Sequence, residues 1–89
     1  MKSEITVVIK NESGLHARPA GLFVKKASEF ASQVQINFDG KTANAKSIMG
    51  LMGLGLQKGS KITLVAEGQD STEAVKELRE LVESGFGEM

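Results

Sequence analysis

A histidine and an arginine lie two residues apart in this chain, where a strand pattern gives way to a helix pattern. His16 is the only histidine among the 89 residues, and only Ala17 separates it from Arg18. A neutral imidazole is a nucleophile, and the planar guanidinium of an arginine matches the oxygen atoms of a phosphate group. The pair therefore suggests chemistry on an anion, with phosphate as the first candidate.

The residues after this pair predict a helix that begins at the histidine. Pro19, the only proline, fits a first helical turn, because its missing N–H would have no helical partner there. We expect the helix to run from His16 or Ala17 to about Glu29, with His16 at or beside the N-cap. The apolar residues recur at the spacing of one helical face, at Ala20, Phe23, Val24, Ala27 and Ala31.

A helix start at His16 would form an anion site. The backbone N–H groups of Ala17 and Arg18 would point outward at the positive end of the helix dipole, where phosphate binds readily. The dipole and the guanidinium both disfavour further positive charge, so we expect His16 to be neutral and nucleophilic. A phosphoryl group on His16 would also meet the hydroxyl of Ser13. The alternative, from the residues alone, is that His16 is a plain helix cap.

A second unusual segment begins at Ser47, which has the position of an N-cap. Residues 48–56 are almost all Leu, Ile, Met or Gly, and about two turns of helix cannot bury apolar side chains on every side. We expect Leu51 and Leu54 in the core and an exposed apolar patch suited to docking several partners. The alternative is a buried helix whose glycines allow close packing. The patch consists of Ile48, Met49 and Met52.

The composition excludes several classes of function. Eleven basic and eleven acidic residues cancel, so the totals imply no basic face for nucleic acid. The lack of cysteine and the single histidine argue against disulfides, a metal centre and a bound cofactor. No segment resembles a signal peptide or a membrane span. We expect one domain over residues 1–89, located in the cytoplasm, with neither nucleic acid nor membrane as a direct partner.

The remaining pattern predicts alternating strands and a last helix. Asp39-Gly40 is typical of a type I′ hairpin turn. Asp70 and Glu73 resemble a capping box at the start of the last helix, and Gly85 marks its end. Four amphipathic strands need one covered face, so we expect an α+β two-layer domain. The strands are expected over residues 4–10, 33–38, 41–45 and 61–67.

Two segments resemble one known family. Residues 14–20, GLHARPA, closely resemble the active-site segment of HPr, the histidine-containing phosphocarrier of the bacterial phosphoenolpyruvate-dependent sugar phosphotransferase system. Residues 44–52, NAKSIMGLM, resemble the regulatory serine segment of HPr from Gram-positive bacteria. The resemblance covers essentially the whole chain. It implies an HPr-like βαββαβα fold, with a four-stranded antiparallel sheet in the order 1-4-2-3 covered on one face by three helices.

The resemblance also implies a function. His16 would receive a phosphoryl group on Nδ1 from phosphorylated enzyme I and pass it to the A domain of a sugar-specific enzyme II. Arg18 would stabilise that group, and Ser13 and Ala17 would contact it. The chain would be a monomeric carrier and co-substrate rather than an enzyme. Its partners would dock on Ala17, Arg18, Ile48, Met49 and Met52.

A regulatory role for Ser47 follows from the same resemblance. The ATP-dependent HPr kinase/phosphorylase would phosphorylate it, and a phosphate at a helix N-terminus suits the helix dipole. We therefore expect little change in fold. The added charge would repel an acidic face of enzyme I and attract a basic partner, which in this family is the catabolite control protein, a transcription repressor. The alternative is that Ser47 is only an N-cap.

Three other functions stay open. A regulatory paralogue would be phosphorylated only on the serine, but such relatives lack the active-site histidine, whereas His16 is present. A carrier of the nitrogen-related branch shares the histidine motif, although residues 47–50 resemble the sugar branch of Gram-positive bacteria more closely. A non-catalytic anion-binding module would act through Ser47 and the apolar patch alone, without becoming phosphorylated.

Overall fold

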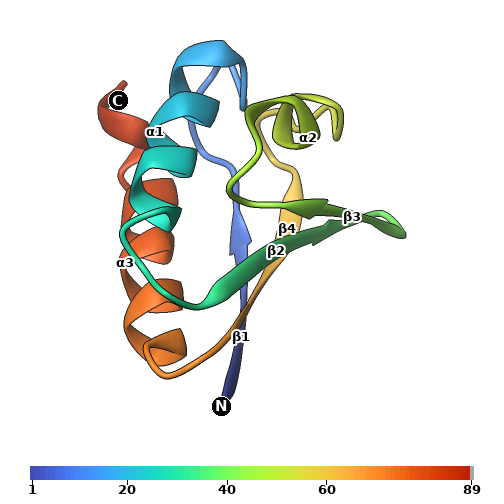
Figure 1. Cartoon of the computed structure of the whole chain (residues 1–89). Helices are drawn as coiled ribbons and strands as arrows, with labels where there is room; N and C mark the ends of the chain where they lie inside the picture. The colour runs from blue at the N-terminus through green and yellow to red at the C-terminus, as the bar shows by residue number, and fades with distance from the viewer. Residues whose placement is uncertain (89) are drawn as a thin grey trace.

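Four antiparallel strands form one sheet in the order β1-β4-β2-β3, as expected. The computed structural model describes residues 1–88, and the helices pack against one side of the sheet (Figure 1). The fold class and the strand order are confirmed. The elements are β1 (Lys2–Val8), α1 (Ala17–Ala27), β2 (Gln33–Phe38), β3 (Lys41–Asn44), α2 (Ile48–Met52), β4 (Lys61–Glu67), α3 (Ser71–Glu83) and a short 3₁₀ helix η1 (Gly85–Gly87).

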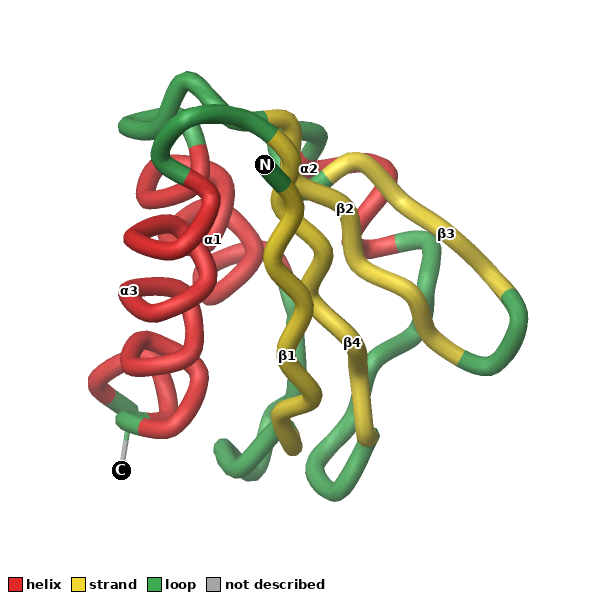
Figure 2. Tube along the Cα trace, turned by 90° about the horizontal axis from the view of Figure 1, so that it is seen from below, coloured by secondary structure: helices red, strands yellow, loops and turns green. Residues whose placement is uncertain are grey.

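The strand pairing separates an apolar face of the sheet from a polar one. One row of paired residues runs from Ile5 through Leu64 and Ile36 to Ala43, and all but Ile5 are buried. Burial of a Leu or Ile side chain contributes about 2 kcal/mol of transfer free energy, which holds α1 and α3 against this face (Figure 2). The adjacent row on the other face is polar and consists of Thr6, Thr63, Asn37 and Thr42.

Element boundaries differ from the sequence-based expectation by about two residues, except in α2. That helix ends at Met52 instead of continuing to residue 56, because Gly55 has a φ of +67°, which a right-handed helix cannot contain. The strand expected to reach residue 10 ends at Val8, since Ile9 instead exchanges hydrogen bonds with the turn at Gly59 and Ser60. The hairpin turn at residues 39–40 is confirmed, with positive φ at both positions.

The capping box expected at the start of α3 is wrong. Asp70 is the N-cap residue, but its side chain makes no capping hydrogen bond. Its carboxylate accepts hydrogen bonds from the amide of Ala31 at 2.8 Å, from the amide of Ser32 at 2.9 Å and from the hydroxyl of Ser32. These bonds, that of the hydroxyl first, hold the pKa of Asp70 below its usual range. Asp70 therefore ties the loop before β2 to the start of α3.

Gly14 allows the loop before α1 to contact the loop after α2. Its φ is +67°, and a Cβ at this position would lie 2.5 Å from the carbonyl oxygen of Leu56 and 2.8 Å from Cα of Gln57. The amide of the buried Leu15 donates to the same carbonyl at 3.1 Å. The contact leaves no room for a side chain, and it fixes the backbone directly before His16.

Replacing Asp70 by Asn should lower the melting temperature at pH 7, because one amide oxygen cannot replace two charged acceptors. The pKa of Asp70 is lower in the folded chain than in the unfolded one, so its contribution is present at neutral pH and is lost as the pH falls below about 4. Thermal unfolding of the two proteins should converge in acid. Glu80→Gln removes an exposed charge from α3 and serves as the control. A constant difference between pH 7 and pH 3 would contradict this role.

Replacing Gly14 by Ala should destabilise the chain by roughly 2 kcal/mol or more, from the left-handed φ together with the clash at Leu56. Gly40→Ala is the matched control, because Gly40 also has a positive φ but nothing within 4 Å of an added Cβ. Urea denaturation should show a clearly larger loss for Gly14→Ala. Equal losses would mean that only backbone conformation matters at Gly14.

Candidate functional site

His16 is the N-cap residue of α1, as expected, and its ring is accessible. The backbone is extended there (φ −81°, ψ −170°), and the side chain makes no capping hydrogen bond. The carbonyl of His16 accepts the first helical hydrogen bond from Ala20 at 2.9 Å. The imidazole is 45% exposed. The alternative that His16 is only a helix cap therefore does not explain its side chain, because the imidazole makes no hydrogen bond to the start of α1.

Ala17 and Arg18 provide backbone donors at the start of α1 that are unpaired within residues 1–88. They are the first two residues of α1, ahead of the first helical hydrogen bond, and Pro19 after them has no N–H to offer. Both residues are exposed. Within residues 1–88 the guanidinium of Arg18 forms no ion pair or hydrogen bond, so it is free to meet an anion. Two amides at the positive end of the helix dipole and one exposed guanidinium thus directly follow the histidine in sequence.

Glu88 is a residue of this site that the sequence analysis missed. Its Oε2 lies 3.3 Å from Nε2 of His16. Its Oε1 accepts hydrogen bonds from Nδ2 of Asn11 at 2.9 Å and from Oγ of Ser13 at 2.8 Å. Glu88 and His16 lie near opposite ends of the chain, so no local pattern could have paired them. Only positive charge around His16 is expected from the sequence, and this carboxylate opposes that charge.

The contacts of Glu88 keep it ionised and in place. Hydrogen bonds from Asn11 first, then from Ser13, hold the pKa of Glu88 below its usual range, and the nearby His16 acts in the same direction. Asn11 is completely buried, and its Nδ2 also donates to the carbonyl of Gly14 at 2.7 Å. The carboxylate is therefore tied to the same loop that carries the histidine.

The phosphoryl contact expected of Ser13 competes with an observed bond. Its hydroxyl carries one proton, and that proton is donated to Glu88. Contact with a phosphoryl group as a donor would require the hydroxyl to rotate away from the carboxylate. The observed role of Ser13 in this structure is to hold Glu88.

Ser47 and the apolar patch are placed as the sequence indicated. Ser47 is the N-cap of α2, and its Oγ accepts a hydrogen bond from the amide of Gly50 at 3.1 Å. Leu51 is fully buried and Leu54 is 6% exposed, whereas the three side chains of the patch are 43%, 81% and 44% exposed. The alternative of a helix buried on all sides is therefore wrong. Because α2 packs against α1 (Figure 1), the patch is carried beside the helix that begins at His16.

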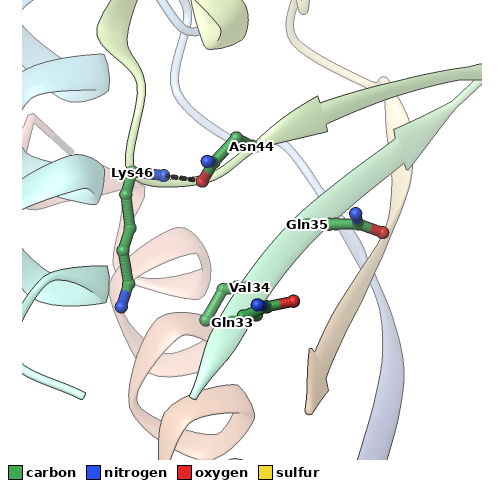
Figure 3. Close-up of a pocket in the computed structure, with 5 residues that line it drawn as sticks. All are labelled: Gln33, Val34, Gln35, Asn44 and Lys46. Atoms are coloured by element: carbon green, nitrogen blue, oxygen red, sulfur yellow. Dashed lines mark hydrogen bonds between the residues drawn. The ribbon is translucent and has the colours of Figure 1, made fainter. Parts of the chain in front are cut away.

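An open pocket of about 260 Å³ involves a different set of residues (Figure 3). The side-chain oxygen of Asn44 accepts from the backbone amide of Lys46 at 2.8 Å, and Nζ of Lys46 donates to the carbonyl of Phe30 at 2.8 Å. The charged group of Lys46 is thus bound to the backbone of the fold. None of the expected site residues lines this pocket. The lining residues are Gln33, Val34, Gln35, Asn44 and Lys46.

The described residues offer no other site of these kinds. No group of three or more His, Cys, Asp or Glu side chains within residues 1–88 could hold a metal ion. No helix in that range combines the length and the hydropathy needed to cross a membrane.

Known proteins resemble this chain over most of its length. The family of the PTS HPr component phosphorylation site matches residues 3–84. The HPr-like protein Crh of Halalkalibacterium halodurans is 51% identical over 80 residues, which cover 90% of this chain and 95% of that protein.

Two solved structures are also similar. HPr-C-His from Thermoanaerobacter tengcongensis is 55% identical, with a TM-score of 0.94 over 98% of both chains. An HPr dimer from the same organism is 56% identical, with a TM-score of 0.79 over 97% of this chain and 99% of that one. The family match and these identities together show that the chain belongs to the HPr family of the phosphotransferase system.

Proposed function

We propose that this chain is a phosphocarrier that takes a phosphoryl group from phosphorylated enzyme I on Nδ1 of His16 and passes it to the A domain of a sugar-specific enzyme II. The observation that carries the proposal is the exposed imidazole at the start of α1, beside the free amides of Ala17 and Arg18. Within residues 1–88, Nδ1 makes no hydrogen bond, whereas Nε2 faces Glu88. Nδ1 is thus the ring nitrogen that a phosphoryl donor can reach.

The transfer needs little machinery from this chain, because phosphoryl transfer depends mainly on positioning and charge stabilisation. The lone pair of Nδ1 forms the new bond to phosphorus, and the donor keeps the electron pair of the bond that breaks. The amides at the helix start and the guanidinium of Arg18 stabilise the phosphoryl oxygens. These are modest, exposed interactions, so the group can leave again for the next acceptor.

Docking would use the apolar patch together with Ala17 and Arg18. The patch is exposed and borne by α2, which packs against α1. An apolar surface beside a cation suits partners that present an apolar face with an acidic rim. We propose a single-domain monomer in the cytoplasm as the acting form, although the similar HPr from Thermoanaerobacter tengcongensis has also been solved as a dimer.

We propose further that phosphorylation of Ser47 by an HPr kinase/phosphorylase regulates this docking. The half-buried Ser47 caps α2, so a phosphate there would lie at the start of the helix that bears the patch. Its charge would repel an acidic face of enzyme I and attract a basic partner such as a catabolite control protein.

A purely regulatory function is the second candidate. The similarity to Crh favours it, because Crh of Bacillus subtilis, which is 46% identical over 90% of this chain, is described as a catabolite repression HPr. The accessible ring of His16 favours the carrier. A carrier of the nitrogen-related branch would share the site and differ only in its partners.

Incubation with phosphoenolpyruvate and enzyme I, followed by intact mass measurement, tests the carrier function. The native chain should gain one phosphoryl group that is lost in acid, and His16→Ala should gain none. Arg18→Ala should still accept the group but more slowly, by at least about tenfold, the effect of losing one charged contact. If an active enzyme I adds no mass to the native chain, the carrier proposal fails and the regulatory candidate replaces it.

Ser47→Asp should slow phosphorylation by enzyme I by at least about fivefold, since it places a negative charge on the docking surface. Asn caps a helix as well as Asp does but carries no charge, so Ser47→Asn is the matched control and should behave as the native chain. The amide spectrum of Ser47→Asp should change only near α2. Equal rates for Asp and Asn, or widespread spectral changes, would contradict a purely electrostatic mechanism.

A further inference from the structure

We propose that Glu88 is a positioning residue for phosphoryl transfer, whose carboxylate keeps a proton on Nε2 of His16 and stabilises the positive charge of the ring when Nδ1 is phosphorylated. This inference rests on the proposed carrier function. Glu88 lies beyond residues 3–84, which the family match covers, so that match carries no information about it. The role of Glu88 follows from the contacts of its carboxylate alone.

The carboxylate lies at the ring nitrogen that does not take the phosphoryl group. Oε2 of Glu88 is 3.3 Å from Nε2 of His16. A neutral imidazole has a proton on one nitrogen and a lone pair on the other, and an ionised carboxylate can only accept hydrogen bonds. Glu88 therefore favours the tautomer with hydrogen on Nε2. This leaves the lone pair on Nδ1, where the phosphoryl donor must approach.

The same contact offsets the charge that the reaction creates. When the lone pair of Nδ1 forms the bond to phosphorus, the donor keeps the electron pair of its broken bond, and Nε2 keeps its proton. The imidazole ring then carries one positive charge, which faces the carboxylate of Glu88. When the group moves on, the electron pair of the N–P bond returns to Nδ1 and the ring is neutral again. Glu88 therefore assists transfer in both directions.

Two other contacts prevent the carboxylate from moving to the phosphoryl side. Oε1 is held by Asn11 and Ser13 at 2.9 and 2.8 Å, and Asn11 is completely buried. Phe86 is 2% exposed and anchors the segment two residues before Glu88. The imidazole ring thus separates the carboxylate from Nδ1, so the attraction to the ring outweighs repulsion of the more distant phosphoryl oxygens.

Two variants separate the hydrogen bond from the charge. Glu88→Gln keeps an acceptor oxygen for the proton on Nε2 but removes the negative charge, and Glu88→Ala removes both. Glu83→Gln, which removes an exposed charge from the end of α3, is the matched control. Melting curves of all variants establish that each is folded before its transfer rate is compared.

The measurements are the rate of phosphoryl uptake at pH 8, from phosphorylated enzyme I and from the small donor phosphoramidate, and the ¹⁵N spectrum of the His16 ring. Glu88→Gln should be slower by about twofold to fivefold with both donors, the size expected of a half-exposed ion pair. Glu88→Ala should be slower still, with more hydrogen on Nδ1. Glu83→Gln should match the native chain.

The outcomes distinguish this inference from the carrier proposal. If the native chain accepts the group and Glu88→Gln is equally fast or faster, the role of Glu88 is refuted and the carrier function stands. A native ring with its hydrogen on Nδ1 would refute it as well. If enzyme I fails to phosphorylate the native chain, the carrier proposal fails, while the phosphoramidate rates and the ring spectrum still decide whether Glu88 assists the histidine.

Discussion

The functional end of this molecule depends on one backbone contact, between Gly14 and the chain at Leu56. No side chain fits there, and the amide of Leu15 donates to the Leu56 carbonyl directly beside it. This contact fixes the loop that leads into α1 against the loop that leaves α2. The start of α1 and the exposed face of α2 are therefore held in a fixed arrangement. A carrier needs this if its partners are to recognise both surfaces at once.

The site balances charges of both signs instead of accumulating positive charge. The helix start and Arg18 favour a negative group near His16, whereas Glu88 favours a positive ring. The two preferences are compatible in the proposed phosphorylated state, because the phosphoryl oxygens would lie at Nδ1 and the carboxylate of Glu88 lies at Nε2, on the other side of the ring. Exposed, opposing interactions of this size hold a group without trapping it. A carrier has to both accept and release its cargo, and such a balance suits that task.

Local patterns predicted most of the fold. The alternation in β2 and β4, the Asp39-Gly40 turn and the N-cap at Ser47 are each determined by neighbouring residues, so a single sequence shows them. The start of α1 directly after His16 was predictable for the same reason, from Pro19 and the apolar spacing after it.

Two features that sequence reasoning missed depend on contacts between distant residues. Asp70 looked like a local cap, but the amides of Ala31 and Ser32 compete for its carboxylate after the chain has folded. Glu88 meets His16 only because η1 returns the C-terminal segment to the loop before α1. The residue types show the charge and the hydrogen-bonding capacity of Asp70 and Glu88. They do not show which residues these side chains contact in the folded chain.

Phosphorylation of Ser47 and the carboxylate of Glu88 would act on different steps of the proposed transfer, because they lie at different places in the fold. Ser47 caps α2 and lies at the base of the apolar patch, so a phosphate there would act on the surface proposed for docking. Glu88 contacts the imidazole itself, so it would act on the proposed transfer. Ser47 makes its one side-chain bond within α2, to Gly50, and Glu88 makes its bonds to the loop before α1. Regulation can therefore change which partners dock without altering the nucleophile.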